Sequence, residues 1–543
     1  MASKWSKIIS GATGNKAEYL VDGTASFKSI ADAIKTARTD EHYIYVMGWM
    51  LDAGLELIKG DPGSAFIKLL EDAAKKSVEI RVLVWDNPIP NANPPESYIQ
   101  MNRDNIPKLN KLPNTAAFID DNTYATDETK KFLSQAVPHI LKQVLKFAAI
   151  FKELDLFFTI LKYAATKNVG SHHDKVIIVK GEKGLIAHAG GIDININRFE
   201  WYQTVRCSYH KDTHSAYHDT HVKVEGPAAH EILQRFIKRW DYHPAAKSKA
   251  LRGRNEPKPK EVKTGDFHYA RAVGTYNDPS GKDRDRSLKD AYLEILRNAK
   301  QYVYIEDQYL VNLDVARELN KRIKDPSFVC LVIVTQDCAE TTDILIPLRR
   351  RSEFYKELVS GASKSDINKV GIFIVDIAGG KKNGWHSGVH AKTLIVDDEL
   401  AIIGSANVNQ RSFTNDSETS LIVFDDTEKV KDTFAKKLRI AIWKEFIRVP
   451  VAPQGYESWF TFSYLVKTVP GFSKLLDLTT APQQEDLDEK IIATIKKSGV
   501  IAPIVVGGLL GQNIQQTSVA LSPITIKAIF DMFWENVIDP EAK

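Results

Sequence analysis

The sequence predicts an α/β fold made of two similar halves, and three observations lead to that prediction. Short apolar runs rich in β-branched and aromatic residues alternate with amphipathic helical stretches, which is typical of layered α/β proteins. Several of these segments occur twice in the same order, and each half carries one His-x-Lys pair. The chain has 543 residues, 43% hydrophobic and 26% charged, so it can bury a large core.

The predicted elements follow one another as strand and helix. Residues 42–51, 78–86 and 301–310 are short runs of branched and aromatic side chains, which favour strands. Residues 65–76 and 287–300 carry apolar side chains at helical spacing. This alternation predicts a sheet that is covered by helices.

The internal repeat consists of three pairs of segments that keep their order along the chain. They are HDKVIIVKG (173–181) with HAKTLIVDD (390–398), YIYVMGWMLD (43–52) with YVYIEDQYLV (302–311), and two helices ending in Trp240 and Trp443. The separation differs from pair to pair, so insertions have accumulated between them. We therefore expect two copies of one α/β unit.

The repeat divides the chain into four parts. Residues 1–243 form the first half, with a helical insertion at about 128–167, and residues 264–450 form the second half. Between them lies 244–263, a basic, proline-containing stretch typical of an exposed linker. Residues 451–543 are a C-terminal extension without a counterpart in the repeat.

Two of these parts allow more than one interpretation. The insertion has an apolar stripe that fits either a helical pair packed on the core or a segment that faces lipid or gates the substrate. The apolar stretch 501–511 of the extension fits either a buried hairpin or a segment that dips into a membrane interface.

Charge and cysteine content exclude several classes of protein. Lys and Arg number 73 against 69 Asp and Glu, a net charge of +4, which argues against a protein that mainly coats nucleic acid. Three cysteines are too few for a disulfide framework or a zinc cluster. The first residues contain no apolar run typical of a signal peptide, and the apolar run 500–510 is shorter than the ~20 residues of a spanning helix.

The two His-x-Lys pairs, His173 with Lys175 and His390 with Lys392, suit phosphodiester cleavage. On a strand, side chains at i and i+2 point to the same face, so each pair projects together. One imidazole can attack phosphorus while the other protonates the leaving oxygen. The two ammonium groups can stabilise the negative charge of the transition state, so we expect no metal and no cofactor.

The second copy continues with further residues at regular spacing: Asp397, Gly404, Ser405, Asn407 and Glu418. With His390 and Lys392 they resemble the phospholipase D superfamily, which is marked by two HxKxxxxD motifs, each followed by a glycine–small pair. The first copy is similar, with Gly190-Gly191-Ile-Asp193 and an Arg-aromatic-acid triplet at 198–200. The resemblance covers roughly residues 20–450 and implies two α/β/α sandwich halves with the active site at their interface.

The resemblance also implies roles for the residues of the site. His173 would be the nucleophile and His390 the general acid, although the symmetric halves do not order them; one imidazole would be neutral and one charged near neutral pH. Glu418 would orient one imidazole, with Glu200 as a weaker candidate for the same role in the first half. The remaining phosphate-binding or orienting residues would be Asn407, Ser405, Asp193 and Asp397.

One residue departs from the family pattern. Lys180 stands where the first motif has its aspartate. Since that aspartate in the family supports the strand end, we expect a change of local structure, with an inactive first site as the alternative.

The resemblance predicts a phospholipase D that hydrolyses membrane phospholipids to phosphatidic acid. One alternative is a nuclease of the same superfamily, which the basic cluster 349–351 favours. Another is an inactive phospholipid-binding protein, which Lys180 favours, and a cardiolipin-type synthase is less favoured. We expect a phospholipid membrane surface as partner, with nucleic acid unlikely, and one chain sufficient for activity. Without a signal peptide the chain would be cytoplasmic in the producer. It resembles type VI secretion effectors, which act on membranes elsewhere and are neutralised by an immunity protein.

Overall fold

The computed structural model describes most of both halves: residues 4–86, 98–120, 170–199, 214–265, 267–277, 283–336, 345–375, 385–447 and 472–475. The predicted insertion at about 128–167, Glu200 and all but four residues of the extension 451–543 lie outside these ranges. No helix within the described ranges is long and apolar enough to cross a membrane.

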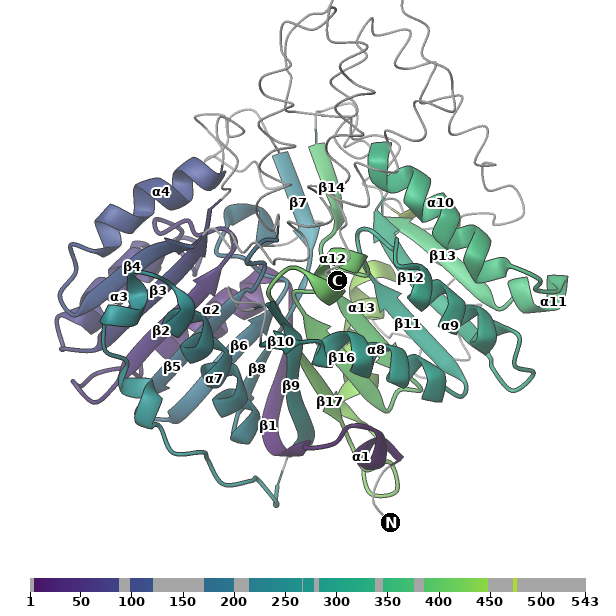
Figure 1. The fold of residues 1–543 in the computed structure, drawn as a ribbon, viewed down its shortest axis with the longest axis horizontal. Helices are drawn as coiled ribbons and strands as arrows, with labels where there is room; N and C mark the ends of the chain where they lie inside the picture. Colours follow the sequence, from purple (N-terminus) through teal and green to yellow (C-terminus); the bar gives the residue numbers. More distant parts are fainter. Residues whose placement is uncertain are drawn as a thin grey trace, which may run out of the picture.

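One continuous sheet runs through both halves (Figure 1). Its strands from the first half are, in spatial order, β4 (Thr115–Asp120), β3 (Glu79–Trp85), β2 (Tyr43–Gly48), β5 (Val176–Gly181), β6 (Gly184–Gly190), β8 (Thr220–Glu225) and β1 (Thr13–Val21). The second half continues with β9 (His268–Asn277), β17 (Glu418–Phe424), β16 (Leu400–Gly404), β15 (Thr393–Val396), β11 (Tyr302–Glu306), β12 (Cys330–Gln336) and β13 (Val370–Val375). Read outward from the β1–β9 pair, the two orders are equivalent, and the predicted α/β fold with two repeated halves is confirmed.

Three further pairings extend this sheet or stand beside it. The short strand β10 (Arg284–Asp285) pairs with β9, and β18 (Phe472–Leu475) pairs with the outer edge of β13. The strands β7 (His214–His218) and β14 (Trp385–Val389) form a separate parallel ribbon that stands between the halves in Figure 1. This ribbon contains one strand from each half.

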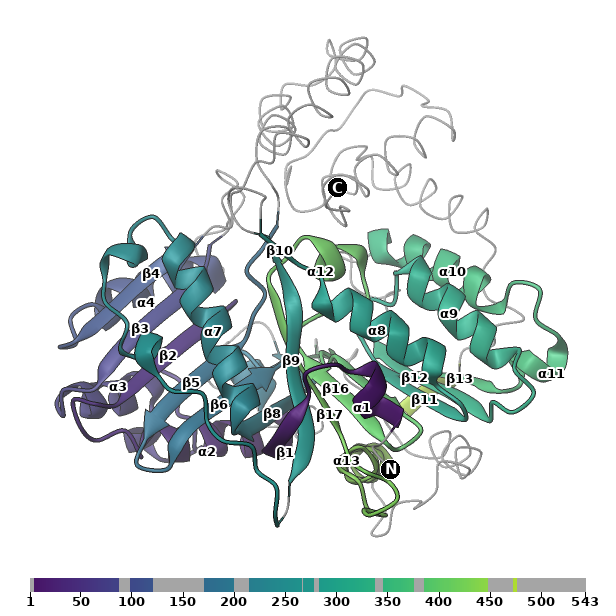
Figure 2. The same cartoon turned by 60° about the horizontal axis from the view of Figure 1, so that its bottom comes forward.

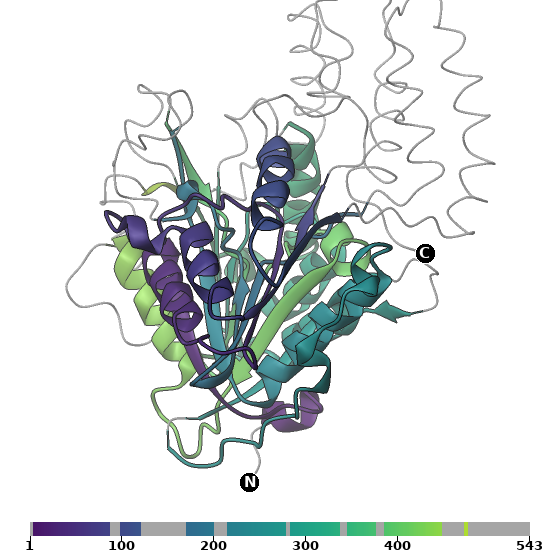
Figure 3. The same cartoon turned by 90° about the vertical axis from the view of Figure 1, so that its left-hand side faces the viewer.

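Helices cover the sheet on both sides (Figures 2 and 3). The α-helices are α1 (Lys4–Ile8), α2 (Asp22–Ile34), α3 (Phe66–Ala74), α4 (Tyr98–Leu109), α7 (Pro227–Tyr242), α8 (Ser287–Asn298), α9 (Leu313–Ile323), α10 (Leu345–Val359), α11 (Lys364–Ile367), α12 (Gln410–Thr414) and α13 (Phe434–Ile447). Short 3-10 turns are η1 (Pro62–Ser64), η3 (Ile196–Arg198), η4 (Ala246–Ser248) and η5 (Arg252–Asn255). The last two lie in the basic linker.

The alternation of side chains along β2 divides the first half into two layers of core. Tyr43 and Tyr45 face a core shared with α7, while Ile44 and Val46 face α2 and α3. Because every residue of this strand is buried, its sequence is a continuous apolar run rather than an alternating one.

The second half repeats this layering. Tyr302 and Tyr304 of β11 face the core that contains α13, while Val303 and Ile305 face α8 and α9. The tyrosine-facing layers of both halves belong to one hydrophobic core, which also holds Trp240 and Trp443, both fully buried. A core shared across the seam holds the halves together, so residues contributed by either half keep fixed relative positions.

Candidate active site

The site lies where the two halves meet, just before strands β5 and β15. The prediction that the two His-x-Lys pairs lie on strands is wrong, because residues 173–175 and 390–392 precede β5 and β15. Each lysine instead turns back on its own pair: Lys175 Nζ donates to the carbonyl of His173 at 2.9 Å, and Lys392 Nζ donates to the carbonyl of His390. Both pairs are therefore held compactly at the entry of a strand.

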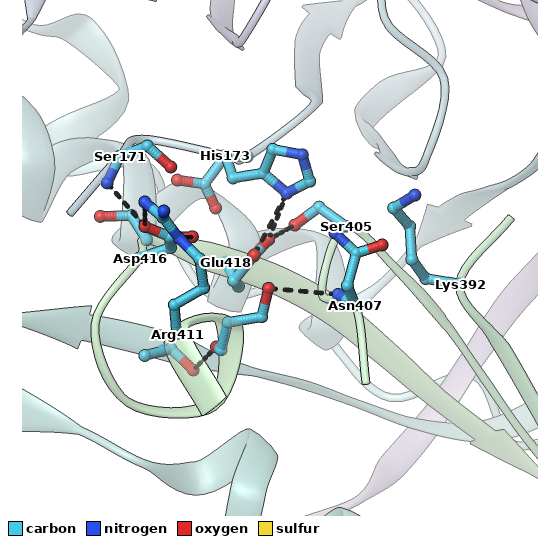
Figure 4. Close-up of polar contacts among 12 residues, drawn as sticks. Ser171, His173, Lys392, Ser405, Asn407, Arg411, Asp416 and Glu418 are labelled. Atoms are coloured by element: carbon cyan, nitrogen blue, oxygen red, sulfur yellow. Dashed lines mark hydrogen bonds and ion pairs between the residues drawn. The ribbon is translucent and has the colours of Figure 1, made fainter. Parts of the chain in front are cut away.

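His173 is held by a carboxylate from the second half. Its Nδ1 lies 3.1 and 3.2 Å from the two carboxylate oxygens of Glu418, the first residue of β17. The backbone N–H of His173 donates to the carbonyl of Ser417 at 2.9 Å, which places the ring over that strand end (Figure 4). Glu418 thus lies where the family resemblance put an orienting acid.

His390 is held in the same way by the first half. Its Nδ1 lies 2.6 Å from Oδ2 of Asp219, which precedes β8, and its backbone N–H donates to the carbonyl of His218 at 2.8 Å. Sequence reasoning missed Asp219 and offered Glu200 instead, which lies outside the described residues. A signal was available, because Asp219-Thr220 and Glu418-Thr419 are matching acid–threonine pairs that open matching strands.

Three other predicted residues lie around these histidines. Ser405 Oγ donates to Oε2 of Glu418 at 2.5 Å, so it supports the acid (Figure 4). Asn407 is buried, and its side-chain oxygen has no hydrogen-bond partner among the described residues. Asp193 accepts the backbone N–H of Met50 at 3.1 Å and lies 3.6 Å from Nζ of Lys175.

Asp397 does not belong to the site, contrary to the expectation. It follows β15, at the opposite end of that strand from His390. There its carboxylate accepts the backbone N–H groups of residues 300–302, at 2.8 to 3.3 Å, and pairs with Lys4 at 2.8 Å. Asp397 therefore stabilises the turn that leads into β11.

Lys180 also lies away from the histidines. Lys180 pairs with Tyr43 of the neighbouring strand β2, just as Asp397 contacts Tyr302 of β11 in the second half. Its Nζ lies 2.5 Å from Oε1 of Glu256 in the linker. In the first half β5 and β6 have six and seven residues, against four and five in β15 and β16. Lys180 is thus a strand residue where the second half already turns, and it gives no reason to expect an inactive first site.

Burial governs the electrostatics of the site. It lowers the pKa of His173 and of His390 well below the usual histidine value, and the cations nearby lower both further. Burial also lowers the pKa of Lys392 to about 8, against the opposing effect of Asp219 and Asp307. Both imidazoles of the free protein are therefore neutral at neutral pH, which differs from the expectation of one charged ring.

The orienting acids respond in the opposite direction. Burial raises the pKa of Glu418 to about 8 and that of Asp219 to about 6. Lys392 and Arg198 limit the rise at Asp219, while at Glu418 the neighbouring Asp416 adds to it. The two histidine–acid pairs are alike in geometry but unequal in charge.

A second buried cluster lies behind Asp219. His218 Nδ1 is 3.2 Å from Asp22 and 3.2 Å from Glu445, and its Nε2 is 3.1 Å from Glu306. These carboxylates raise the pKa of His218 well above its usual value despite its burial, which acts the other way. Asp22, His218 and Glu445 form a group whose potential ligand atoms all lie within 4.8 Å of one another, and within the described part of the chain it is the group that could hold a metal ion. A protonated His218 between the carboxylates accounts for the same arrangement without a metal.

Two arginines of the basic cluster at 349–351, Arg350 and Arg351, are engaged in the fold. Arg351 donates to the backbone carbonyls of Tyr309, at 2.9 Å, and Gln308. Arg350 pairs with Glu353 at 2.7 Å. These contacts weaken the argument for a nucleic-acid surface there.

Comparison with known proteins agrees with this architecture. The family profile described as "Phospholipase D" matches residues 33–266, and the profile described as "Cardiolipin synthase, PLD-like domain" matches residues 292–440. Phospholipase D alpha 1 of Cynara cardunculus is 24% identical over 78% of this chain and 63% of its own length; the protein of the same name from Arabidopsis thaliana is 24% identical over 73% and 60%. The chain thus spans less than two thirds of the length of these relatives.

The fold has a counterpart among solved structures. Phosphatidylserine synthase of Haemophilus influenzae superposes with a TM-score of 0.51 at 12% identity, over 92% of this chain and 97% of that one. The two profile matches fall one on each half, and each includes one of the two His-x-Lys pairs that meet at the seam. This chain therefore belongs to the phospholipase D superfamily of phosphodiester hydrolases and transferases.

Proposed function

We propose that the protein is a phospholipase D, which cleaves the phosphodiester bond on the headgroup side of membrane phospholipids and releases phosphatidic acid. One observation carries the proposal: two histidines, each held by an acid of the opposite half, lie in one buried site with Lys175 and Lys392. Relatives that bear the name phospholipase D support the choice of substrate.

In the first step, His173 attacks phosphorus through Nε2. The reactive form has Glu418 ionised, which its raised pKa of about 8 places at the alkaline side of neutrality; the carboxylate then accepts a hydrogen bond from Nδ1–H of His173 and leaves the lone pair on Nε2. As the P–N bond forms and the bond to the headgroup oxygen breaks, His390 donates its Nε2 proton to that oxygen. Lys175 and Lys392 stabilise the negative charge on the remaining phosphate oxygens.

The neutral state of His390 in the free protein is compatible with this role. A phosphodiester carries one negative charge, and its entry raises the pKa of a nearby imidazole. Asp219 at 2.6 Å stabilises the imidazolium that results. His390 therefore gains its proton in the substrate complex.

In the second step, water attacks phosphorus, the P–N bond breaks, and His390 takes a proton from the water. An alcohol in place of water transfers the phosphatidyl group instead. The match of the second half to the profile of cardiolipin synthase favours a test of transfer as the second candidate.

Mass spectrometry of mixed phospholipid vesicles tests the proposal. Wild type is incubated with phosphatidylcholine, phosphatidylethanolamine and phosphatidylglycerol, with and without added glycerol, beside His173→Ala and His390→Ala. His230→Ala on α7 is the matched control, because the His230 ring hydrogen-bonds the carbonyl of Glu256 in the linker, at 3.0 Å, rather than a residue of the site. Phosphatidic acid from wild type and control alone is expected, whereas phosphatidic acid from either site variant, or none from folded wild type, contradicts the proposal.

We further propose that the protein acts on membranes outside the producing cell, as a secreted effector with an immunity protein in the producer. The argument is chemical, since an enzyme that converts phospholipid to phosphatidic acid endangers the membranes of its own cell. Export of wild type and His173→Ala to a bacterial periplasm tests it. Toxicity of wild type alone is expected, and equal growth of both strains contradicts it.

A further inference from the structure

Arg198 is a buried cation that belongs to neither His-x-Lys pair. It ends η3, in the loop that follows β6, and is 4% exposed. Its guanidinium lies between two acids, with Nη2 3.7 Å from Oδ2 of Asp193 and Nε 3.6 Å from Oδ2 of Asp219. Asp193 faces Lys175 and Asp219 holds His390, so Arg198 adjoins a partner of each.

The arginine is fixed from outside the site. Its Nη1 donates to Oδ1 of Asn197 at 3.0 Å, and its guanidinium lies 4.8 Å from the ring centre of Tyr217. Its buried Nε has no hydrogen-bond partner among the described residues. Since a buried guanidinium is costly without compensation, its charge is balanced by the two nearby carboxylates rather than by a full set of hydrogen bonds.

Among the described residues of the second half, the position equivalent to Arg198 holds no cation, although Lys175 acts on Glu418 from the first half. Arg198 lies five residues after Asp193, and the residue five after the equivalent Asn407 is Ser412. Ser412 and Ser405 hydrogen-bond to Glu418 and thereby lower its pKa, against the effect of burial. The neighbouring Arg411 turns to Asp416 instead, at 2.6 Å, as Figure 4 shows.

We propose that Arg198 is a positioning residue that assigns the proton-donor role to His390, because it holds the Asp219 carboxylate ionised and aimed at Nδ1 of that ring. This inference rests on the proposed function and adds to it the reason why two equivalent histidines act differently. In this role Arg198 acts on the transferred proton through Asp219 and His390.

The charges around His390 agree with this role. Those that face it are Asp219 before β8, Arg198 at the end of η3, Lys392 before β15, and Lys175 with His173 before β5. Besides burial, Arg198 is the first cause that lowers the pKa of His390, and it also lowers that of Asp219. Loss of Arg198 therefore raises both pKa values.

Two variants and one control test the inference. Arg198→Met removes the charge at similar length, and Arg198→Lys keeps the charge on a group too small to reach both acids. Arg235→Met is the matched control, since Arg235 on α7 pairs with Asp285 of β10 at 2.6 Å, outside the site. The first readout is the NMR titration of histidines labelled at Cε1 with carbon-13, in which His390 is assigned by the signal lost in His390→Gln.

In Arg198→Met the His390 titration is expected to move up by about one pH unit or more, as removal of a charge a few ångströms away requires. Arg198→Lys is expected to move it less, and Arg235→Met not at all. An unchanged His390 titration in folded Arg198→Met overturns the inference. This readout needs no turnover, so it stands apart from any failure of the proposed phospholipase activity.

The pH dependence of kcat/KM on phosphatidylcholine vesicles is the second readout. Wild type is expected to lose activity in two stages as pH falls, first as Glu418 and then, near pH 6, as Asp219 takes up a proton. In Arg198→Met the lower stage moves up while the Glu418 stage stays, and kcat falls about 100-fold or more. If Arg198→Met does not fold, Arg198→Lys decides: wild-type kcat in that variant overturns the inference.

Discussion

The two halves of the molecule share one strand order but surround their histidines differently. In the first half, the counter-charge of Lys175 is Asp193, which comes from the loop after β6. The equivalent residue of the second half is the amide Asn407, and there Asp307, at the end of β11, acts on Lys392 instead. The two lysines therefore occupy equivalent positions in the repeat, whereas the acids that balance their charge come from different elements of the two halves.

This difference teaches that a symmetric scaffold does not make symmetric chemistry. Asp307 is fixed by backbone N–H groups, since it accepts those of Tyr309, Leu310 and Val408 at 2.7 to 2.9 Å. Asp193 accepts one N–H, that of Met50, and adjoins Arg198. The His-x-Lys pairs are identical in the two halves and place the histidines and lysines alike. The acids and cations around them differ, and these differences decide how tightly each site group binds its proton.

The largest predicted effect separates the two histidines. His173→Gln and His390→Gln should each lower kcat by ~10⁴-fold or more, with little further loss in the double variant, because the residues act as one unit. A p-nitrophenyl phosphodiester has a leaving group that needs no proton. On that substrate His390→Gln should recover activity and His173→Gln should not.

Steady-state kinetics on vesicles and on the chromogenic substrate check this prediction. The matched control is His230→Gln, which should behave as wild type on both. Equal recovery of both variants would show that the halves are interchangeable, and recovery of His173→Gln alone would reverse their roles.

The next effect concerns the two acids. Glu418→Gln and Asp219→Asn should each lower kcat by ~10²- to 10⁴-fold, since the amide permits the wrong imidazole tautomer. Yet Glu418→Gln should also stabilise the fold at neutral pH, by roughly 1–3 kcal/mol, because a carboxyl whose folded pKa is raised disfavours the charged native state.

The sign of the pH dependence follows from these raised pKa values. The folded protein binds the proton more tightly than the unfolded chain, so stability falls as pH rises, from about 4.5 to about 8 for Glu418 and from about 3.8 to about 6 for Asp219. Urea unfolding of wild type and both variants at pH 5 and pH 8 measures this. A wild-type slope that persists unchanged in both variants would contradict it.

The cluster behind Asp219 distinguishes the halves in stability rather than turnover. The equivalent of His218 in the second half is Ser417, whose Oγ meets Nδ1 of His172 at 2.8 Å. Breaking a buried charge cluster leaves its partners uncompensated, so His218→Gln should cost ~3 kcal/mol of unfolding free energy, and Ser417→Ala about 1 kcal/mol.

The stabilisation by His218 depends on pH, and the direction follows from its raised pKa. The folded pKa of His218 is raised, so its stabilisation is complete below about pH 6.5 and is lost only as pH rises through the higher folded value. Thermal unfolding at pH 6 and pH 9 should show the His218→Gln deficit shrinking at the higher pH. An equal deficit at both values would assign it to packing alone.

Sequence reasoning reached the parts of the site that repeat. His173, Lys175, His390 and Lys392 were found because two weak motifs in one chain support each other, and Glu418 was found from its spacing. Asp219 was missed because its only repeat signal is a two-residue acid–threonine pair, and the role of Arg198 was missed because the equivalent residue of the second half is Ser412. In the first half the acid follows Gly190 by 29 residues, and in the second it follows the equivalent Gly404 by 14, so spacing could not transfer.

The error at Asp397 has a different physical cause. Asp397 was grouped with the phosphate-binding or orienting residues, although the aspartate of the first motif was expected to support a strand end. A strand rises about 3.3 Å per residue. The four residues of β15 therefore put Asp397 well over 10 Å from the entry of the strand, where His390 lies. Short strands separate the two ends of a sequence motif that looks compact on the page.

The smallest predicted effect compares the residues at the far ends of these strands. Asp397 has a φ of 55° and accepts three consecutive backbone N–H groups, so Asp397→Ala should cost roughly 1–3 kcal/mol of unfolding free energy. Lys180 has only a partly exposed ion pair with Glu256, worth about 1 kcal/mol or less, and Lys180→Ala should change stability by no more than that.

Neither substitution should change kcat more than about threefold, because neither side chain reaches the histidines. Denaturant unfolding and vesicle turnover of both variants measure the two expectations together. Loss of turnover in folded Lys180→Ala would return the first-half motif position to the chemistry. Equal stability of Asp397→Ala and wild type would show that Asp397 does not stabilise its turn. The first half has Lys180 at the equivalent position because the longer strands β5 and β6 continue past the point where the second half turns, so no acid is needed there to hold a turn.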